Sequence, residues 1–167
     1  MLPLKIRPAT INDISSIVEV RVGALTVEEL SGFVVPGDNL YSSVERLSEM
    51  WDKDNLLQDG FELFVAESRG RIIGFIVFTL KGEDNIDNII VAKEEQGKGV
   101  GRVLVEHIEK LAISGGFDVL GTDTTENVNG VPWRAYGFWK RMGYEDTGER
   151  VPSEYGFKNI PLVKKLK

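Results

Sequence analysis

The sequence predicts an α/β fold in which helices cover one mixed β-sheet, and three of its features predict this class. Strand-like and helix-like patterns are interspersed along the chain in the order β-α-α-β-β-β-α-β-α-β-β. Two apolar runs within residues 61–80 flank a Ser-Arg-Gly turn, which is typical of an antiparallel hairpin. A glycine-rich stretch at residues 97–101 leads from a strand pattern into a helix pattern. The length of 167 residues and the lack of an internal repeat predict a single domain over residues 1–167.

The N-terminal half of the chain contains a strand and two helices before the hairpin. Residues 4–7 predict a short strand, which Pro8 ends. Thr10 is a favourable helix cap, and the apolar residues after it recur at helical spacing. A less regular region with glycine and proline follows, and residues 41–51 then predict a second helix.

The C-terminal half alternates strands and helices. Residues 85–92 predict a strand, and the helix after the glycine stretch runs to about Ser114, where Gly115 and Gly116 end it. The remaining elements are expected to be strands at 117–125, 144–150 and 158–163 and a short helix at 133–142.

Composition excludes several kinds of function. The formal net charge of −6 argues against nucleic acid as a main partner, because phosphate backbones require clustered lysine and arginine. The absence of cysteine excludes disulfides, thiolate metal sites and a cysteine nucleophile, and no metal is expected. The chain has neither a signal-peptide pattern nor an apolar run long enough to span a membrane, so we expect a cytoplasmic protein without a membrane partner.

The glycine stretch has the features of a phosphate-binding loop. The start of a helix leaves about four backbone N–H groups without partners and carries about half a positive charge. Glycines there allow a bulky anion to approach the main chain. The spacing of the glycines fits neither the nucleotide P-loop nor the dinucleotide fingerprint. A glycine-rich turn without any ligand is the structural alternative.

Four segments resemble the GCN5-related N-acetyltransferases, the GNAT family. "VAKEEQGKGVGRVLVEHIEKL" is similar to the acyl-coenzyme A loop and helix of that family, and "KIRPATINDISSIVEV" to its first strand and helix. "LFVAESRGRIIGFIVF" is similar to its central hairpin, and "AYGFWKRMGYEDTGER" to its last helix and the following strand. The four occur in the family's order and cover most of the chain. The resemblance implies a mostly antiparallel sheet in which parallel strands 4 and 5 splay apart.

The resemblance also implies a site for acetyl-CoA between the splayed strands, residues 85–91 and 117–125. Backbone groups of Ile89, Ile90 and Val91 would pair with the pantetheine arm, and one N–H would polarise the thioester carbonyl. An asparagine of the family's pantetheine site corresponds to Asn129, with Asn127 as the alternative. The residues expected at the pyrophosphate and along the last helix are Gln96, Gly97, Lys98, Gly99, Val100, Gly101, Arg102, Phe138 and Trp139.

Trp139 departs from the family pattern, which places a tyrosine there as general acid. An indole N–H donates hydrogen bonds but is not a practical acid, and core packing is the alternative role for this side chain. A thiol of pKa about 8.5 leaves as thiolate at only about 2 kcal/mol above the thiol at pH 7, so turnover can survive. The proton could come from water or from one of three tyrosines, Tyr136, Tyr144 and Tyr155.

A general base is the larger requirement. An amine of pKa about 10.4 is neutral in only about 1 molecule in 2,500 at pH 7, a cost near 4.6 kcal/mol. A carboxylate could remove the proton directly or through water. Asp87 on the first splayed strand and Asp123 on the second are the best-placed candidates, and Glu83 and Asp84 on the preceding turn are alternatives.

The expected activity is transfer of an acetyl group from acetyl-CoA to a primary amine of a small molecule, polyamine, peptide or protein, by direct attack. One alternative is an acyl-CoA-binding sensor or regulatory module with weak or no turnover. Another is a nucleotide enzyme that binds ATP or NAD. Residues 21–60 and 151–157 would shape the acceptor site. A homodimer that forms through the last strands is a possible assembly. The segments "RVGALTVEELSGF" and "ERVPSEYGF" carry acidic residues that could face a cationic acceptor or could be solvated surface, namely Glu28, Glu29, Glu149 and Glu154.

Overall fold

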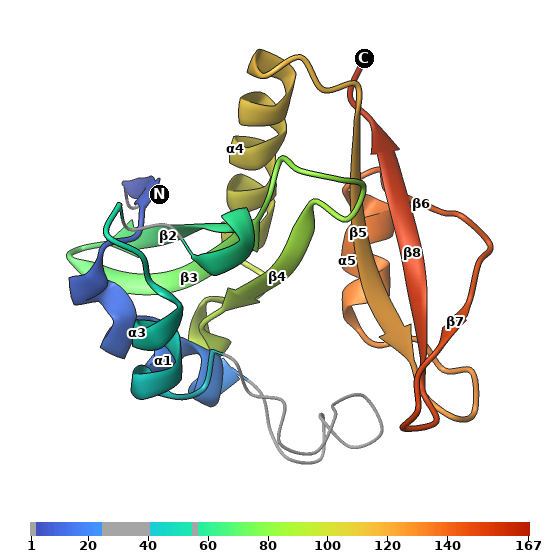
Figure 1. Cartoon of the computed structure of the whole chain (residues 1–167), viewed down its shortest axis with the longest axis horizontal. Coiled ribbons are helices and arrows are strands. Elements are labelled where there is room, and N and C mark those ends of the chain that lie inside the picture. The colour runs from blue at the N-terminus through green and yellow to red at the C-terminus, as the bar shows by residue number, and fades with distance from the viewer. Residues whose placement is uncertain (1–2, 25–40, 55–56) are drawn as a thin grey trace.

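The computed structural model describes residues 3–24, 41–54 and 57–167, and it contains one eight-stranded sheet flanked by helices (Figure 1). The strand order is β1-β2-β3-β4-β5-β8-β6, and β7 also pairs with β8. The strands are β1 (Leu4–Pro8), β2 (Glu62–Ser68), β3 (Arg71–Phe78), β4 (Ile86–Val91), β5 (Val119–Glu126), β6 (Glu145–Asp146), β7 (Val151–Pro152) and β8 (Lys158–Lys165). The described α-helices are α1 (Ile14–Ala24), α3 (Val44–Met50), α4 (Val100–Ser114) and α5 (Ala135–Arg141), and the short 3-10 helices are η1 (Ile11–Asp13), η2 (Gln58–Gly60) and η3 (Lys93–Glu95).

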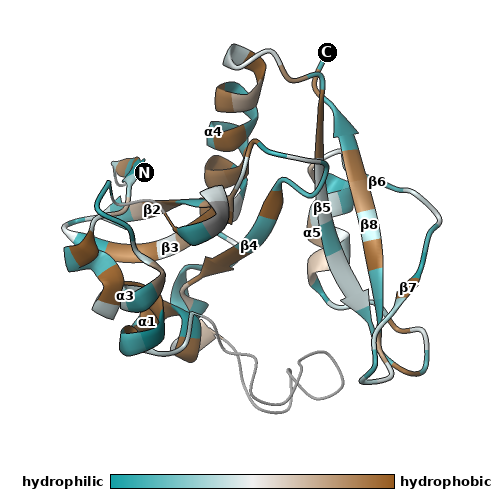
Figure 2. Cartoon of the chain, viewed as in Figure 1, coloured by the Kyte–Doolittle hydropathy of each residue, from teal (hydrophilic) through white to brown (hydrophobic). Residues whose placement is uncertain are grey.

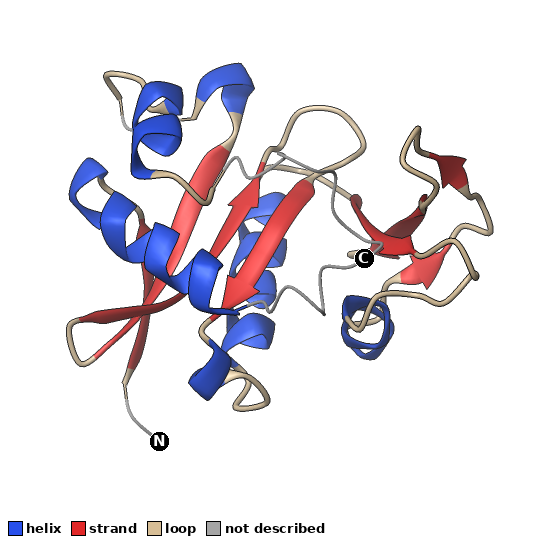
Figure 3. Ribbon diagram, turned by 90° about the horizontal axis from the view of Figure 1, so that it is seen from below, coloured by secondary structure: helices blue, strands red, loops and turns tan. Residues whose placement is uncertain are grey.

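Helices cover both faces of the first four strands, and each face has its own hydrophobic core. On one face α4 packs against β3 through a cluster that includes Ile76, Leu104 and Ile108. On the other face α1 packs through Ile17 against Phe75 and its neighbours. Seen from below, β5 and β8 form a separate group of strands beside α5 (Figure 3). None of the helices in the described ranges is long and apolar enough to cross a membrane.

The two groups of strands meet at one short junction. Strands β4 and β5 are parallel, whereas the other described strand pairs are antiparallel, and their register contains a single pair, Ile86 and Thr122. The buried side chain of Asn85 accepts a hydrogen bond from the Gly121 N–H at 2.9 Å, and the Asn85 N–H donates to the Gly121 carbonyl at 3.0 Å. A Cβ at Gly121 would overlap the carbonyl oxygen of Glu83, so glycine allows this close approach. Beyond the junction the strands separate, as the resemblance implied (Figure 1).

The hydropathy of β5 changes where the strands separate. The strand begins with hydrophobic residues and is pale to teal, weakly to strongly hydrophilic, from its middle onward (Figure 2). Leu120 is fully buried, whereas the residues from Thr122 onward are threonines and carboxylates. Polar side chains therefore lie on β5 from the point where one of its edges loses β4 as a partner, while the other edge stays paired with β8.

Most of the predicted elements are confirmed, with differences at their ends. The first helix begins as η1, and the second begins at Val44, where the Ser43 hydroxyl accepts a hydrogen bond from the Arg46 N–H at 3.2 Å. The strand predicted at 144–150 is wrong beyond its first residues. The Asp146 carboxylate accepts a hydrogen bond from the Gly148 N–H at 2.8 Å, and Gly148 has φ 85°, so a turn ends the strand there.

Candidate active site

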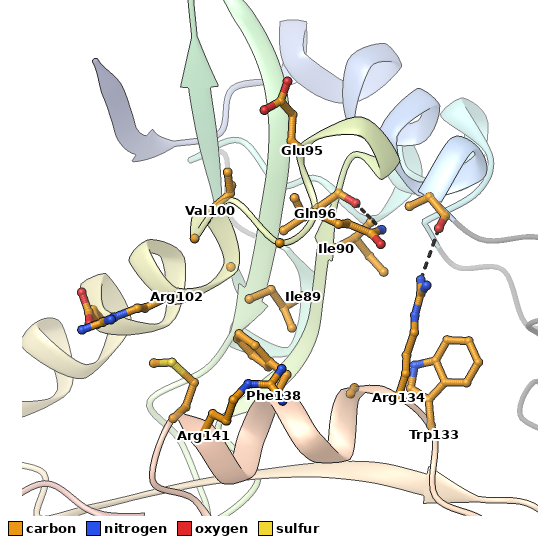
Figure 4. Close-up of a pocket in the computed structure, with 18 of the residues that line it drawn as sticks. Ile89, Ile90, Glu95, Gln96, Val100, Arg102, Trp133, Arg134, Phe138 and Arg141 are labelled. Carbon is orange, nitrogen blue, oxygen red and sulfur yellow. Dashed lines mark hydrogen bonds and ion pairs between the residues drawn. The ribbon is translucent and has the colours of Figure 1, made fainter. Parts of the chain in front are cut away.

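A pocket of about 810 Å³ opens where β4 and β5 separate. Its walls come from β4, the loop after it, the first turns of α4 and one side of α5 (Figure 4). From β4 it is lined by Ile89, Ile90 and Val91, which lie beyond the single residue pair that joins β4 to β5. Because β5 has already diverged at this level, the edge of β4 facing the pocket has no strand partner from β5.

The glycine loop lets the main chain approach a ligand in this pocket. Gly97 and Gly99 have φ angles of 76° and 88°, values that side-chain-bearing residues rarely adopt. A Cβ on either glycine would meet no protein atom within 4 Å, so the space beside them is open. Gly99 is also the N-cap residue of α4, immediately before its first residue. The loop is held to β4 by the Gln96 side chain, which donates a hydrogen bond to the Val91 carbonyl at 3.0 Å (Figure 4).

These features fit the shape and charge of an acyl-CoA. The pocket combines an apolar end at β4, suited to an extended pantetheine arm, with the N-terminus of a helix of 15 residues, suited to a diphosphate. In the described part of the chain, no group of three or more histidines and carboxylates could hold a metal ion.

The structure brings most of the predicted donor-site residues together. Ten line the pocket: Ile89, Ile90, Val91, Gln96, Gly97, Gly99, Val100, Gly101, Arg102 and Phe138. Lys98, Asn129 and Trp139 do not line it. Lys98 forms an exposed ion pair with Glu95 at 3.2 Å, and the backbone N–H of the exposed Asn129 donates to the Asn127 side chain at 3.0 Å.

Trp139 is part of the hydrophobic core in the described structure. It is 2% exposed, and its ring contacts those of Phe138 and Tyr144, each with centroids 5.0 Å apart. Its helix neighbour Phe138 faces the pocket instead, next to Gly101 of α4. The two aromatic residues of this motif therefore point in different directions, one to the core and one to the ligand space.

Sequence reasoning missed two pocket-lining residues that come just before α5. Trp133 and Arg134 precede α5, and the Arg134 guanidinium lies 5.1 Å from the Trp133 ring. The same guanidinium donates a 3.4 Å hydrogen bond to the carbonyl of Ala24, the last residue of α1, which also lines the pocket (Figure 4). No sequence pattern signals this contact, because it joins residues 110 positions apart.

The two predicted carboxylates lie immediately beyond the pocket. Asp87 and Asp123 each follow the paired residues Ile86 and Thr122, so they stand on the two strands where the separation begins. Asp87 accepts a hydrogen bond from the Tyr41 hydroxyl at 3.0 Å, and Tyr41 is buried with its ring edge against Phe75. Sequence reasoning placed Tyr41 in a helix and assigned it no role.

Asp123 is more basic than an ordinary carboxylate. It is exposed on β5, yet the protein atoms around its carboxyl remove part of its hydration, and the negative charges of Asp84 and Asp87 oppose its ionisation. Together these effects raise the pKa of Asp123 to about 6. Since Asp87 acts on Asp123 in this way, the two carboxylates share one electrostatic environment across the separating strands.

The three candidate tyrosines differ in their surroundings. The Tyr136 hydroxyl donates to Asp146 at 3.1 Å, and this hydrogen bond raises the pKa of Tyr136. Burial raises the pKa of Tyr144, which is 1% exposed. Tyr155 is exposed and stacks on Phe157. In the described structure none of the three lines the pocket.

Comparisons with known proteins agree with this geometry. A family model described as an acetyltransferase (GNAT) domain matches residues 59–146. The peptidyl-lysine N-acetyltransferase YjaB of Escherichia coli is 32% identical over 124 residues, which cover 74% of this chain and 76% of the relative.

Solved structures extend the likeness to the whole fold. The PaiA N-acetyltransferase of Thermoplasma acidophilum, solved with coenzyme A, superposes with a TM-score of 0.74 at 18% identity over 98% of this chain and 99% of that one. A chimera of the spermidine N-acetyltransferase SpeG of Vibrio cholerae and hSSAT superposes with a TM-score of 0.71 at 16% identity over 98% and 95% of the two chains.

Proposed function

The chain belongs to the GNAT acetyltransferase family and is an acyltransferase, and we propose that it transfers an acetyl group from acetyl-CoA to a primary amine by direct attack. One observation supports this proposal most strongly. The glycine-lined pocket ends on β4 at Ile89, only two residues from Asp87, and Asp123 lies at the matching level of β5. A donor held in the pocket would therefore present its acyl end to the carboxylates.

Main-chain groups hold the donor in this proposal. The amides between Gln96 and Gly101, with the dipole of α4, bind the diphosphate, and one such contact contributes about 0.3–2 kcal/mol depending on burial. The free edge of β4 pairs with the pantetheine arm as an additional strand would. An N–H of β4 near Ile89 donates to the thioester oxygen and stabilises negative charge that develops on it.

Asp123 accepts the proton of the amine. A carboxylate with a pKa of about 6 is mostly ionised at pH 7 and is a stronger base than one with an ordinary pKa near 3.9. Asp87, held by Tyr41, attracts the incoming ammonium group and raises the basicity of Asp123. The neutral amine then attacks the acyl carbon, its nitrogen gives up a second proton to water, and the C–S bond breaks as the thiolate leaves. Water supplies the thiol proton, since Trp139 is buried in the core and the three tyrosines do not line the pocket.

A lysine side chain on a peptide is the first acceptor to test. The relative YjaB is named a peptidyl-lysine N-acetyltransferase, and Asp84, Asp87 and Asp123 give the proposed acceptor side a negative charge suited to an ammonium group. A shared fold does not fix the acceptor, so polyamines belong in the same screen. Of the acidic residues that sequence analysis placed near the acceptor, Glu28 and Glu29 lie outside the described residues.

The test measures thiol release from acetyl-CoA with a panel of lysine peptides and polyamines, beside calorimetry with CoA, ATP and NAD. We expect micromolar CoA binding and acceptor-dependent thiol release. Binding of CoA without release from any acceptor would support the sensor module instead. Binding of ATP or NAD in preference to CoA would contradict both.

A further inference from the structure

Four cationic side chains line the pocket, and one of them differs from the others. Arg102 pairs with Glu106 at 2.7 Å, and Lys164 pairs with Glu109 at 2.8 Å. Arg134 donates to a carbonyl and lies over the ring of Trp133. The guanidinium of Arg141, on the last residue of α5, has no ion pair or hydrogen bond among the residues that the structure describes. It is therefore the cation in this pocket that has no protein partner within the described residues.

Gly137, a glycine within α5, leaves the space that the Arg141 guanidinium occupies. Gly137 lies one turn before Arg141, inside the helix, where glycine costs about 0.5–1 kcal/mol relative to alanine. A Cβ at Gly137 would have one neighbour within 4 Å, the Nη1 atom of Arg141, at 3.3 Å. The Arg141 side chain accordingly runs back along α5 toward Phe138 and the pocket (Figure 4). A bulkier residue at 137 would compete with the guanidinium for this space.

The position of Arg141 relative to the loop indicates which anion it would meet. The diphosphate of the proposed donor occupies the glycine loop, and its pantetheine arm occupies the gap beside β4. The opposite end of the donor must then follow the groove between α4 and α5, which is lined by Glu106, Glu109 and Arg141. That end of coenzyme A carries a ribose with a 3′-phosphate. Because both glutamates are already paired with cations, Arg141 supplies the positive charge of this groove that remains for a phosphate.

We propose that Arg141, placed by Gly137, binds the 3′-phosphate of the donor and makes the protein prefer CoA to 3′-dephospho-CoA. Arginine is suited to this role because its planar donors match two phosphate oxygens at once. The proposal rests on the proposed function, since it requires the diphosphate to lie at the glycine loop.

Calorimetry of the full chain with CoA and with 3′-dephospho-CoA tests it. The wild type should bind CoA at least about 10-fold more tightly than dephospho-CoA, the order expected for one charge-assisted contact. Arg141→Gln should reduce this ratio to about 1 by weakening CoA binding alone. Gly137→Ala should reduce it partly, and this variant also tests the placement without removing a charge. Lys140→Gln is the matched control, because Lys140 is exposed on the same helix and does not line the pocket, and its ratio should equal that of the wild type.

Each other outcome overturns the proposal in a recognisable way. If the ratio of the affinities for CoA and dephospho-CoA is unchanged in Arg141→Gln, this arginine does not bind the 3′-phosphate. Equal weakening of both ligands assigns Arg141 to the diphosphate instead. Failure of the wild type to bind either ligand refutes the donor site itself, and with it the proposed function. A thermal melt of each variant checks that the loss is not one of folding.

Discussion

The two sides of the gap between β4 and β5 are built in different ways. The proposed donor side is built around one continuous stretch, residues 89–102, whose glycines leave the main chain open, and α5 adds side chains to it. The proposed acceptor side consists of side chains from distant segments, namely Tyr41, Asp87 and Asp123. Backbone groups can hold the part of a substrate that never changes, whereas side chains can be exchanged to suit different acceptors. The difference explains why the resemblance to the family is most specific at the donor loop.

The largest expected effect is on the acceptor side. Asp123→Asn removes the proposed base, and we expect acceptor-dependent thiol release to fall by about 100- to 10,000-fold, the usual range for loss of a general base. Affinity for CoA, measured by calorimetry, should stay within about 2-fold of wild type. Asp84→Asn is the control, since it removes a nearby negative charge without removing the base. Equal activity of the Asp123→Asn and wild-type proteins would show that the proton is taken elsewhere.

A substitution at the junction of β4 and β5, which joins the two sides, should lower the stability of the protein. Gly121→Ala places a Cβ against the carbonyl of Glu83, and overpacking of this kind costs about 2–3 kcal/mol. For a chain of this length we expect the Tm to fall by about 5–10 °C. Gly23→Ala serves as control, because a Cβ there meets nothing within 4 Å and alanine favours the helix. A Gly121→Ala variant as stable as wild type would contradict the close approach of the strands.

The proposed donor side is tested by two glycines with similar positive φ angles. Gly99 and Gly116 stand before and after α4 with φ angles of 88° and 85°, and a Cβ on either would meet no protein atom within 4 Å. Alanine at either position should cost about 1–2 kcal/mol of stability. We expect only Gly99→Ala to weaken CoA binding, by about 10-fold, because its Cβ enters the ligand space. Equal CoA affinity of the two variants would count against a diphosphate at this loop.

The smallest expected effect separates the roles of the two acceptor-side carboxylates. If Asp123 is the base, kcat/KM should decline as the pH falls through about 6, where this carboxylate takes up a proton. Asp87→Asn removes a negative charge that opposes the ionisation of Asp123, so it lowers the pKa of Asp123. The acid limb of the pH profile should therefore move to lower pH, by a few tenths of a unit to about one unit. A limb that moves to higher pH, or does not move, would contradict this coupling.

The fold was predictable because its signals are local. The hairpin turn, the glycines around α4 and the periodicity of α4 each lie within a short window, and the structure confirms them. The strand predicted at 144–150 failed because a side-chain turn at Asp146 competes with extended backbone, and periodicity does not register that competition.

The candidate site likewise has one part that the sequence predicts from local signals and another part that only the tertiary structure shows. The donor loop can be recognised without any structure, since its glycines, its amides and the helix behind them are consecutive and need no distant partner. Tertiary structure was needed to establish that Tyr41 reaches Asp87, that Asp87 acts on Asp123, and that Arg141 faces the pocket while Trp139 enters the core. These relations depend on strand register and helix packing, which bring together residues that are far apart in the chain.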